Sequence, residues 1–158
     1  LIEFVSGSDG LVQWKDFNGV SGAHRNYSPS HLLEVESSIR KTSSGSSLKA
    51  TPRDTTSTPF GVKLGSILVN SGSAVTISIW TFATTTGETI SLYVPQNSYF
   101  GFSSDQEATN AGYSVNTWTQ ISKTFTPTQQ GELEVYVKFT NNSTSSAFYV
   151  DDFSVSQA

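Results

Sequence analysis

The sequence predicts an all-β fold made of many short strands, which is typical of a sandwich or a barrel. Three observations lead to this prediction. Short stretches alternate apolar and polar residues, clusters of Gly, Pro, Asn and Ser separate them, and no stretch of helical length repeats apolar residues every 3.6 positions. A chain of 158 residues is long enough for one such domain. We therefore expect residues 1–158 to form a single β-sandwich domain.

The first half of the chain contains four predicted strands. An apolar run opens the chain, and three later stretches place apolar residues on one face by alternation. Pro52 ends the third strand, because proline lacks the N–H that a strand ladder needs. The predicted strands cover residues 1–5, 33–36, 47–51 and 60–69.

The second half has the clearest alternation. In residues 75–80 three β-branched apolar residues alternate with Thr, Ser and Trp, and in residues 133–139 four apolar residues alternate with Glu, Tyr and Lys. Residues 96–116 show no clear period, so we expect a long loop there. The predicted strands cover residues 75–80, 90–94, 118–126, 133–139 and 148–155.

The last strand contains two adjacent carboxylates, Asp151 and Asp152. Phe148 and Val150 share one face of this strand, whereas Phe153 and the next apolar residue have the opposite parity. If both apolar pairs point to one core, one extra residue must be absorbed between them. We therefore predict a β-bulge at the two acids, which would re-aim one carboxylate.

Composition excludes several classes of protein. The formal charge is −4, and only 14% of residues are charged, so non-specific nucleic-acid binding is not expected. Cysteine is absent, which excludes disulfides and thiolate chemistry. No apolar run reaches membrane-spanning length, so we expect no membrane insertion. Methionine is absent even at position 1, so we expect a processed product or a module of a larger protein.

Four segments of the chain follow one another in a recognisable order. They are residues 44–49 (SGSSLK), 75–80 (VTISIW), 118–127 (WTQISKTFTP) and 149–155 (YVDDFSV). Together they resemble the galactose-binding-domain-like carbohydrate-binding modules. Those modules are antiparallel two-sheet jelly-roll sandwiches, often appended to polysaccharide-degrading enzymes, and similar domains occur in structural proteins of tailed phages. The resemblance therefore implies an all-β jelly-roll sandwich that binds a glycan.

The same resemblance implies a structural calcium between the start of the chain and the last strand. It places Asp151 or Asp152 at that site, with Glu3 as the N-terminal acid. This chain departs from the family pattern at Ser46, where an acid is common, and in having its N-terminal acid before Phe4 rather than after an aromatic residue. The alternative is that the two aspartates are solvated carboxylates at a sheet edge.

No set of residues predicts catalysis. His24 and His31 lie in one loop region, but no third zinc ligand is identifiable. Acids are numerous enough for a glycosidase pair, but no pair is anchored by a motif, and there is no Gly-x-Ser-x-Gly sequence. We therefore predict that the chain is not an enzyme.

Aromatic residues are the candidates for ligand binding, because an aromatic ring can stack on the apolar face of a sugar. Trp80 and Tyr136 each lie on the polar-alternating side of a strand, and together they could form a platform if they share one exposed face. Tyr99 lies in the long loop, and Trp118 begins a predicted strand. The alternative for Trp80 is packing under a covering loop, and Tyr136 could be an ordinary strand tyrosine.

The sequence thus favours a non-catalytic glycan-binding or adhesion module of a larger secreted or virion-surface protein. The expected partner is a polysaccharide or a surface glycan, at an extracellular location or on a virion surface. The second hypothesis is a structural or decoration domain of a phage virion or surface assembly, which contacts only its parent polypeptide or sister subunits.

Overall fold

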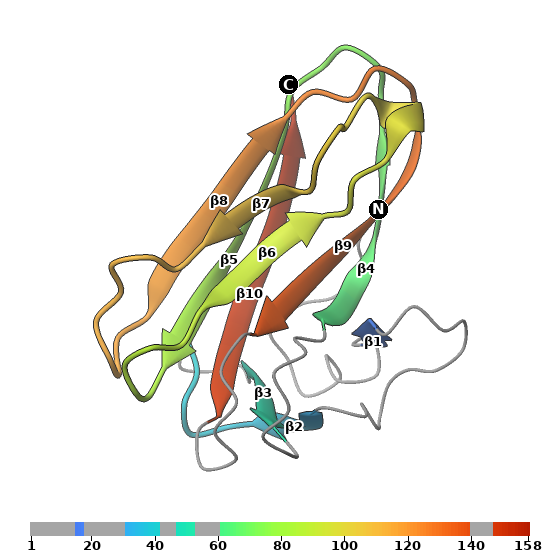
Figure 1. Cartoon of the computed structure of the whole chain (residues 1–158). Coiled ribbons are helices and arrows are strands. Elements are labelled where there is room, and N and C mark those ends of the chain that lie inside the picture. The colour runs from blue at the N-terminus through green and yellow to red at the C-terminus, as the bar shows by residue number, and fades with distance from the viewer. Residues whose placement is uncertain (1–14, 18–30, 42–46, 53–60, 140–146) are drawn as a thin grey trace.

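The computed structural model describes residues 15–17, 31–41, 47–52, 61–139 and 147–158. These residues form two five-stranded sheets that enclose one apolar core (Figure 1). The strand pairs of the described residues are all antiparallel. The predicted fold class, an all-β antiparallel two-sheet jelly-roll sandwich, is therefore confirmed. Within the described residues, no helix is long and apolar enough to cross a membrane.

The first sheet, called sheet A here, has the strand order β1-β4-β9-β6-β7. The register between β4 and β9 shifts at residues 63–65. The strands are β1 (Lys15–Phe17), β4 (Gly61–Val69), β9 (Gly131–Phe139), β6 (Ile90–Val94) and β7 (Gln106–Thr109).

The second sheet, sheet B, has the strand order β2-β3-β10-β5-β8. From β4 onwards the chain crosses repeatedly between the sheets, so strands that follow one another in sequence are often not neighbours in a sheet. This connectivity is the jelly-roll pattern. The strands are β2 (His31–Glu36), β3 (Ser47–Pro52), β10 (Phe148–Gln157), β5 (Val75–Ala83) and β8 (Thr119–Phe125).

Alternating residues of both sheets fill the space between them. Ile77 and Ile79 of β5, together with Val137 of β9, are completely buried. Phe139 of sheet A stacks on Phe148 of sheet B, with ring centroids 4.3 Å apart. Each such side chain contributes about 1.5–3 kcal/mol by its burial. The core therefore holds the two sheets together and leaves each with an outer face that does not contribute to it.

The predicted bulge in the last strand is confirmed. The register between β10 and β5 shifts between Asp151 and Ser154, and Asp152 has a φ of 50°. Phe148 and Val150 lie in the core, and Phe153 and Val155 pack against it.

The segment predicted as a long loop contains two regular elements, so that prediction was incomplete. A 3-10 helix, η1 (Ser98–Phe100), is capped by Asn97, and β7 pairs with β6. The four residues of β7 show no apolar alternation because they form the edge of sheet A. The expectation that Phe100 and Phe102 anchor this segment is confirmed, since each ring is 4% exposed.

Candidate functional site

Two tyrosines lie side by side on the outer face of sheet A. Tyr93 of β6 and Tyr136 of β9 are direct partners in the register of the two strands. Their rings stack with centroids 5.6 Å apart and an interplanar angle of 23°. Neighbouring residues of each strand point into the core, so the strand period turns both rings outward. We call Tyr93 and Tyr136 the tyrosine pair.

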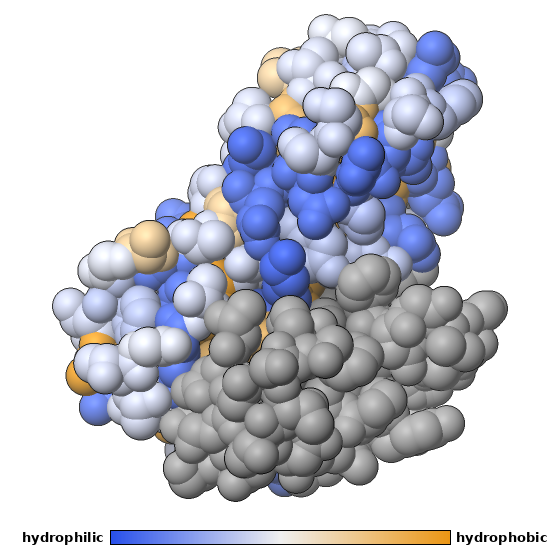
Figure 2. Space-filling view, in the orientation of Figure 1, coloured by the Kyte–Doolittle hydropathy of each residue, from blue (hydrophilic) through white to orange (hydrophobic). Residues whose placement is uncertain are grey.

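Charged side chains surround the tyrosine pair. The Lys138 ammonium lies 4.8 Å from the centre of the Tyr93 ring and 3.1 Å from Glu107 Oε2. The hydroxyl of Tyr136 donates a 2.9 Å hydrogen bond to Glu134 Oε1. Figure 2 shows hydrophilic side chains gathered over β6, β7 and β9. This face therefore combines aromatic carbon with hydrogen-bond donors and acceptors.

Burial raises the pKa of both tyrosines. Tyr93 is 3% exposed and Tyr136 is 6% exposed, and desolvation of the phenolate is the main cause for each. The carboxylates of Asp105 and Glu107 raise the pKa of Tyr93 further, and the hydrogen bond to Glu134 does the same for Tyr136. Both hydroxyl groups therefore stay protonated at neutral pH and can act as donors.

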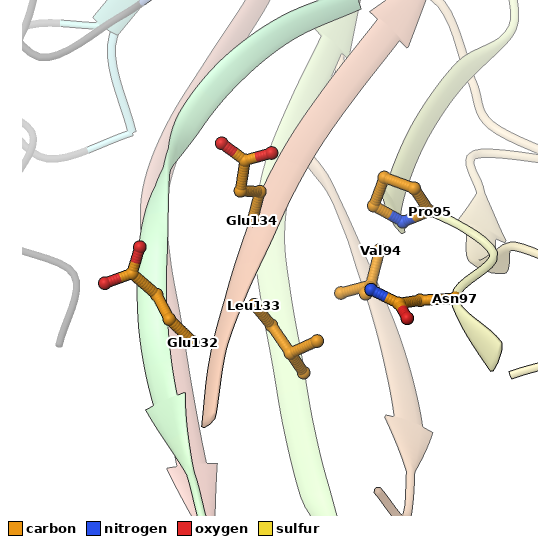
Figure 3. A pocket seen from close by; sticks show the side chains of 6 residues that line it. All are labelled: Val94, Pro95, Asn97, Glu132, Leu133 and Glu134. Carbon is orange, nitrogen blue, oxygen red and sulfur yellow. The ribbon is translucent and has the colours of Figure 1, made fainter. Parts of the chain in front are cut away.

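A pocket of about 260 Å³ lies beside the tyrosine pair. The hydrogen-bonded pairing of β6 with β9 ends at the tyrosine pair, and Pro95 is the first residue after β6. Because proline has no N–H, the ladder does not continue, and β9 and the chain after β6 separate. Figure 3 shows Glu132 and Glu134 on β9, with Pro95 and Asn97 across from them. The pocket, called the β9 pocket below, is lined by Val94, Pro95, Asn97, Glu132, Leu133 and Glu134.

The outer face of sheet B carries a second group of aromatic rings. Phe82 of β5 lies 5.2 Å from Trp118 at an interplanar angle of 53°, and 5.7 Å from Tyr149 of β10 in an edge-to-face arrangement. Trp80 lies on the same strand and the same face, two residues before Phe82. These rings pack against one another at steep angles rather than forming a flat stack.

A segment after β2 covers part of this second face. The ammonium of Lys41 lies 4.2 Å from the centre of the Trp80 ring. The backbone N–H of Lys41 donates a 2.9 Å hydrogen bond to Asp151 Oδ2, and the N–H of Asp152 donates a 2.8 Å bond to Asp151 Oδ1. Asp151 is 3% exposed. Its carboxylate therefore holds the backbone of Lys41 against sheet B through this hydrogen bond.

A family model described as a carbohydrate binding domain matches residues 10–145. The chain belongs to this family. Binding of a glycan is therefore the function of the domain, and a domain that makes only protein contacts is not favoured. No curated protein matches the chain.

Solved structures of carbohydrate-binding modules and of a phage tailspike share the fold. The CBM22-1 xylan-binding domain of Paenibacillus barcinonensis Xyn10C is 18% identical with a TM-score of 0.62, over 97% of this chain and 91% of that one. The CBM22-1–GH10 modules of Clostridium thermocellum xylanase 10B, complexed with xylohexaose, are 16% identical with a TM-score of 0.63, over 98% of this chain and 27% of that one. The bacteriophage CBA120 tailspike protein 4 is 11% identical with a TM-score of 0.63, over 98% and 21% of the two chains.

The structure separates the predicted ligand-binding residues of the carbohydrate-binding domain. Trp80 and Trp118 share the outer face of sheet B, whereas Tyr136 lies on the outer face of sheet A. The expectation that Trp80 and Tyr136 could form one platform is therefore wrong, because the sandwich core lies between them. Tyr99, in η1, is 60% exposed and follows the pocket residue Asn97 by two positions. Binding by each residue stays a prediction.

Sequence reasoning missed Tyr93. This tyrosine is the outward-facing residue between two core residues, Leu92 and Val94, as Tyr136 is between Val135 and Val137. The alternation in residues 90–94 was a sufficient signal that Tyr93 faces outward. The signal that it meets Tyr136 is absent from the sequence, because the pairing of β6 with β9 depends on the strand order.

The predicted calcium ligands are not brought together in the described residues. Glu3 lies outside them, and no group of three or more His, Cys, Asp or Glu side chains that could hold a metal occurs among them. Asp151 and Asp152 are adjacent at the bulge, and Asp151 already accepts two backbone N–H groups. A carboxylate has about four lone-pair positions, so these two hydrogen bonds leave positions on Asp151 that a metal ion could use. Calcium binding by the two aspartates therefore stays a prediction.

Proposed function

We propose that the domain binds an extended, neutral polysaccharide across the outer face of sheet A, without chemistry, and that the tyrosine pair forms the floor of the site. The observation that supports this most is the stacked pair with charged side chains around it. A sugar ring has an apolar face, which suits an aromatic surface, and hydroxyl groups at its rim, which suit carboxylates and ammonium groups.

Lys138 and Glu107 have a defined part in this proposal. Tyr93 and Tyr136 are 3% and 6% exposed, so the side chains that cover them must move aside before a sugar can stack. The Lys138 ammonium, which lies over Tyr93, is one of these groups. Lys138 and Glu107 are both partly exposed, and an ion pair of this kind is worth about 0–1 kcal/mol. Moving the lysine to the rim of the ring therefore costs little. There, Lys138 and Glu107 can hydrogen bond to the sugar hydroxyls.

The family and similar structures support a polysaccharide as the ligand. One similar structure is a xylan-binding domain, and another is in complex with xylohexaose. We therefore propose a β-1,4-linked chain as the ligand, as part of a module that acts outside the cell or on a virion surface. Open faces of this type bind such chains with micromolar to millimolar dissociation constants, or about −8 to −4 kcal/mol.

Substitution of Tyr136 tests the proposal. Calorimetric titration with xylohexaose, and electrophoresis through gels that contain xylan or cellulose derivatives, would measure binding. We expect Tyr136→Ala to weaken binding by roughly tenfold or more, and Tyr136→Phe, which keeps the ring but loses the bond to Glu134, by a few-fold. Because Tyr136 is buried, melting curves must accompany the Ala variant, and the Phe variant covers the case in which Ala unfolds the domain.

The matched control is Trp118→Ala on the outer face of sheet B. It also removes a large aromatic ring, but from the face that the proposal leaves without glycan. We expect binding like that of the unaltered chain. The proposal would be wrong if Trp118→Ala lost binding while both folded Tyr136 variants bound fully. That result would assign the site to sheet B.

A further inference from the structure

The β9 pocket continues the tyrosine pair along β9. Glu134 lines the pocket, and it also accepts the hydrogen bond from the hydroxyl of Tyr136. Leu68 of β4 pairs with Glu132 and is 62% exposed, so an apolar side chain flanks the same end of this face. A glycan lying across the tyrosine pair would therefore reach the pocket with its next sugar.

The size and lining of the pocket suit one sugar residue. Its volume of about 260 Å³ lies just below the range of about 300–1,000 Å³ for sites that enclose whole drug-sized ligands. Pro95 supplies apolar carbon and Asn97 supplies an amide, while Val94 and Leu133, which belong to the core, close the bottom of the pocket. The lining thus offers both contacts for a sugar ring and partners for its hydroxyl groups.

The charged residues that line the pocket are both acidic. Glu132 and Glu134 lie two residues apart on β9, so both point to the same face, and both are exposed. Among the described lining residues there is no Lys or Arg. Lys138, on the same face of β9, is four residues from Glu134, or roughly 13 Å along a strand, and is paired with Glu107. A carboxylate accepts hydrogen bonds from sugar hydroxyls but repels a second carboxylate.

We propose that the β9 pocket is a subsite for one uncharged sugar residue, and that Glu132 and Glu134 exclude uronic acids from it. The proposal rests on the proposed function, because it extends the same glycan site. It assigns to two acidic side chains the discrimination between neutral and acidic polysaccharides. The tyrosine pair cannot supply that discrimination, since an aromatic ring contacts the apolar face that both kinds of sugar share.

A matched pair of ligands tests the proposal. Cellohexaose and the hexamer of glucuronic acid are both β-1,4-linked. Each sugar of cellohexaose carries a hydroxymethyl group where each sugar of the other hexamer carries a carboxylate. Binding of both to the full chain would be measured by calorimetry at low salt. We expect the neutral hexamer to bind on the order of tenfold more tightly. We expect that ratio to shrink in 0.5 M salt, because salt screens exposed charges.

Charge-neutral variants identify the residues responsible. Glu132→Gln, Glu134→Gln and the double variant keep the size of the side chain and one acceptor oxygen. We expect the double variant to lose most of the preference for the neutral hexamer. The control for each single variant is Glu34→Gln, which makes the same change of one charge at an exposed residue of sheet B and should leave the preference unchanged.

The outcomes separate this inference from the proposed function. If the unaltered chain binds the two hexamers equally, or if the double variant keeps the full preference, the charge-selective subsite is wrong while glycan binding on sheet A stands. If Glu34→Gln changes the preference as much as Glu132→Gln or Glu134→Gln does, net charge rather than the pocket is responsible, and the subsite is again wrong. If neither the hexamers nor xylan bind, the proposed function falls and this inference falls with it.

Discussion

The two outer faces of the sandwich both carry aromatic rings, but the rings are arranged in different ways. On sheet A, Tyr93 and Tyr136 stack with an interplanar angle of 23°, beside a pocket. On sheet B, Phe82 meets Trp118 at 53° and Tyr149 at 87°. Offset-stacked and edge-to-face rings are both typical of packing between side chains, so the interplanar angle alone does not distinguish a ligand face. The difference that matters is that charged side chains and a pocket lie beside the rings of sheet A.

A lysine lies over a ring on each face, and the two lysines are held differently. The backbone of Lys41 is fastened to Asp151, which is buried. Lys138 is held through its ammonium group by Glu107, and both of these side chains are partly exposed. Lys41 is therefore part of the structure of sheet B, whereas Lys138 can exchange its partner for a ligand.

The largest expected effect is on stability, at Asp151. Asp151→Ala removes the acceptor of two backbone N–H groups in a site that is 3% exposed. Hydrogen bonds to a charged group contribute about 1.5–3 kcal/mol each, so we expect the loss of both to cost about 3–6 kcal/mol. Urea unfolding would measure it. Folded Asp151→Ala should still bind glycan, and loss of binding in the folded variant would contradict the separation of the two faces.

Calcium provides a second test of the Asp151 region. If a calcium ion binds at the bulge, a concentration of one hundred times its dissociation constant stabilises the fold by about 2.7 kcal/mol. We then expect the melting temperature to fall by several degrees in chelator. Asp152→Asn should remove this difference, because Asn tolerates the left-handed backbone at this position but has no charge. Equal melting temperatures with calcium and with chelator would reject the metal site.

Alkaline pH should weaken the domain through its buried tyrosines. The folded-state pKa values of Tyr93 and Tyr136 are raised, mainly by burial, and that of Tyr149 is raised by burial and by nearby glutamates. The unfolded chain therefore loses these protons first, so the contribution of the three tyrosines to stability is complete below about pH 10 and falls above it. Melting curves from pH 8 to 11.5 would show this fall. Tyr93→Phe and Tyr149→Phe should each flatten it, but only Tyr93→Phe should change glycan affinity.

Most of the fold could be predicted because its strands alternate in a regular way. β5 and β9 have core residues at every second position, and the parity change in β10 predicted the bulge at Asp151 and Asp152. β7 could not be predicted, because an edge strand contributes little to the core and its residues, Gln106–Thr109, carry no apolar pattern.

The candidate site was harder to predict than the fold. Alternation indicated that Tyr136 faces outward, and the same signal in residues 90–94 was sufficient to place Tyr93 on an outer face. Nothing in the sequence shows that β6 and β9 are neighbours, since they are separated by two other strands in the chain. For the same reason, the sequence could not show that Trp80 and Tyr136 lie on opposite sheets.

The most direct test of the account is a nuclear magnetic resonance titration of the labelled, unaltered chain with xylohexaose. The backbone amides and the indole N–H groups report the two faces separately in one experiment. The account predicts that the amides of Tyr93, Glu134 and Tyr136 shift, while the indole signals of Trp80 and Trp118 do not. Shifts confined to β5, β8 and β10, with movement of both indole signals, would contradict it.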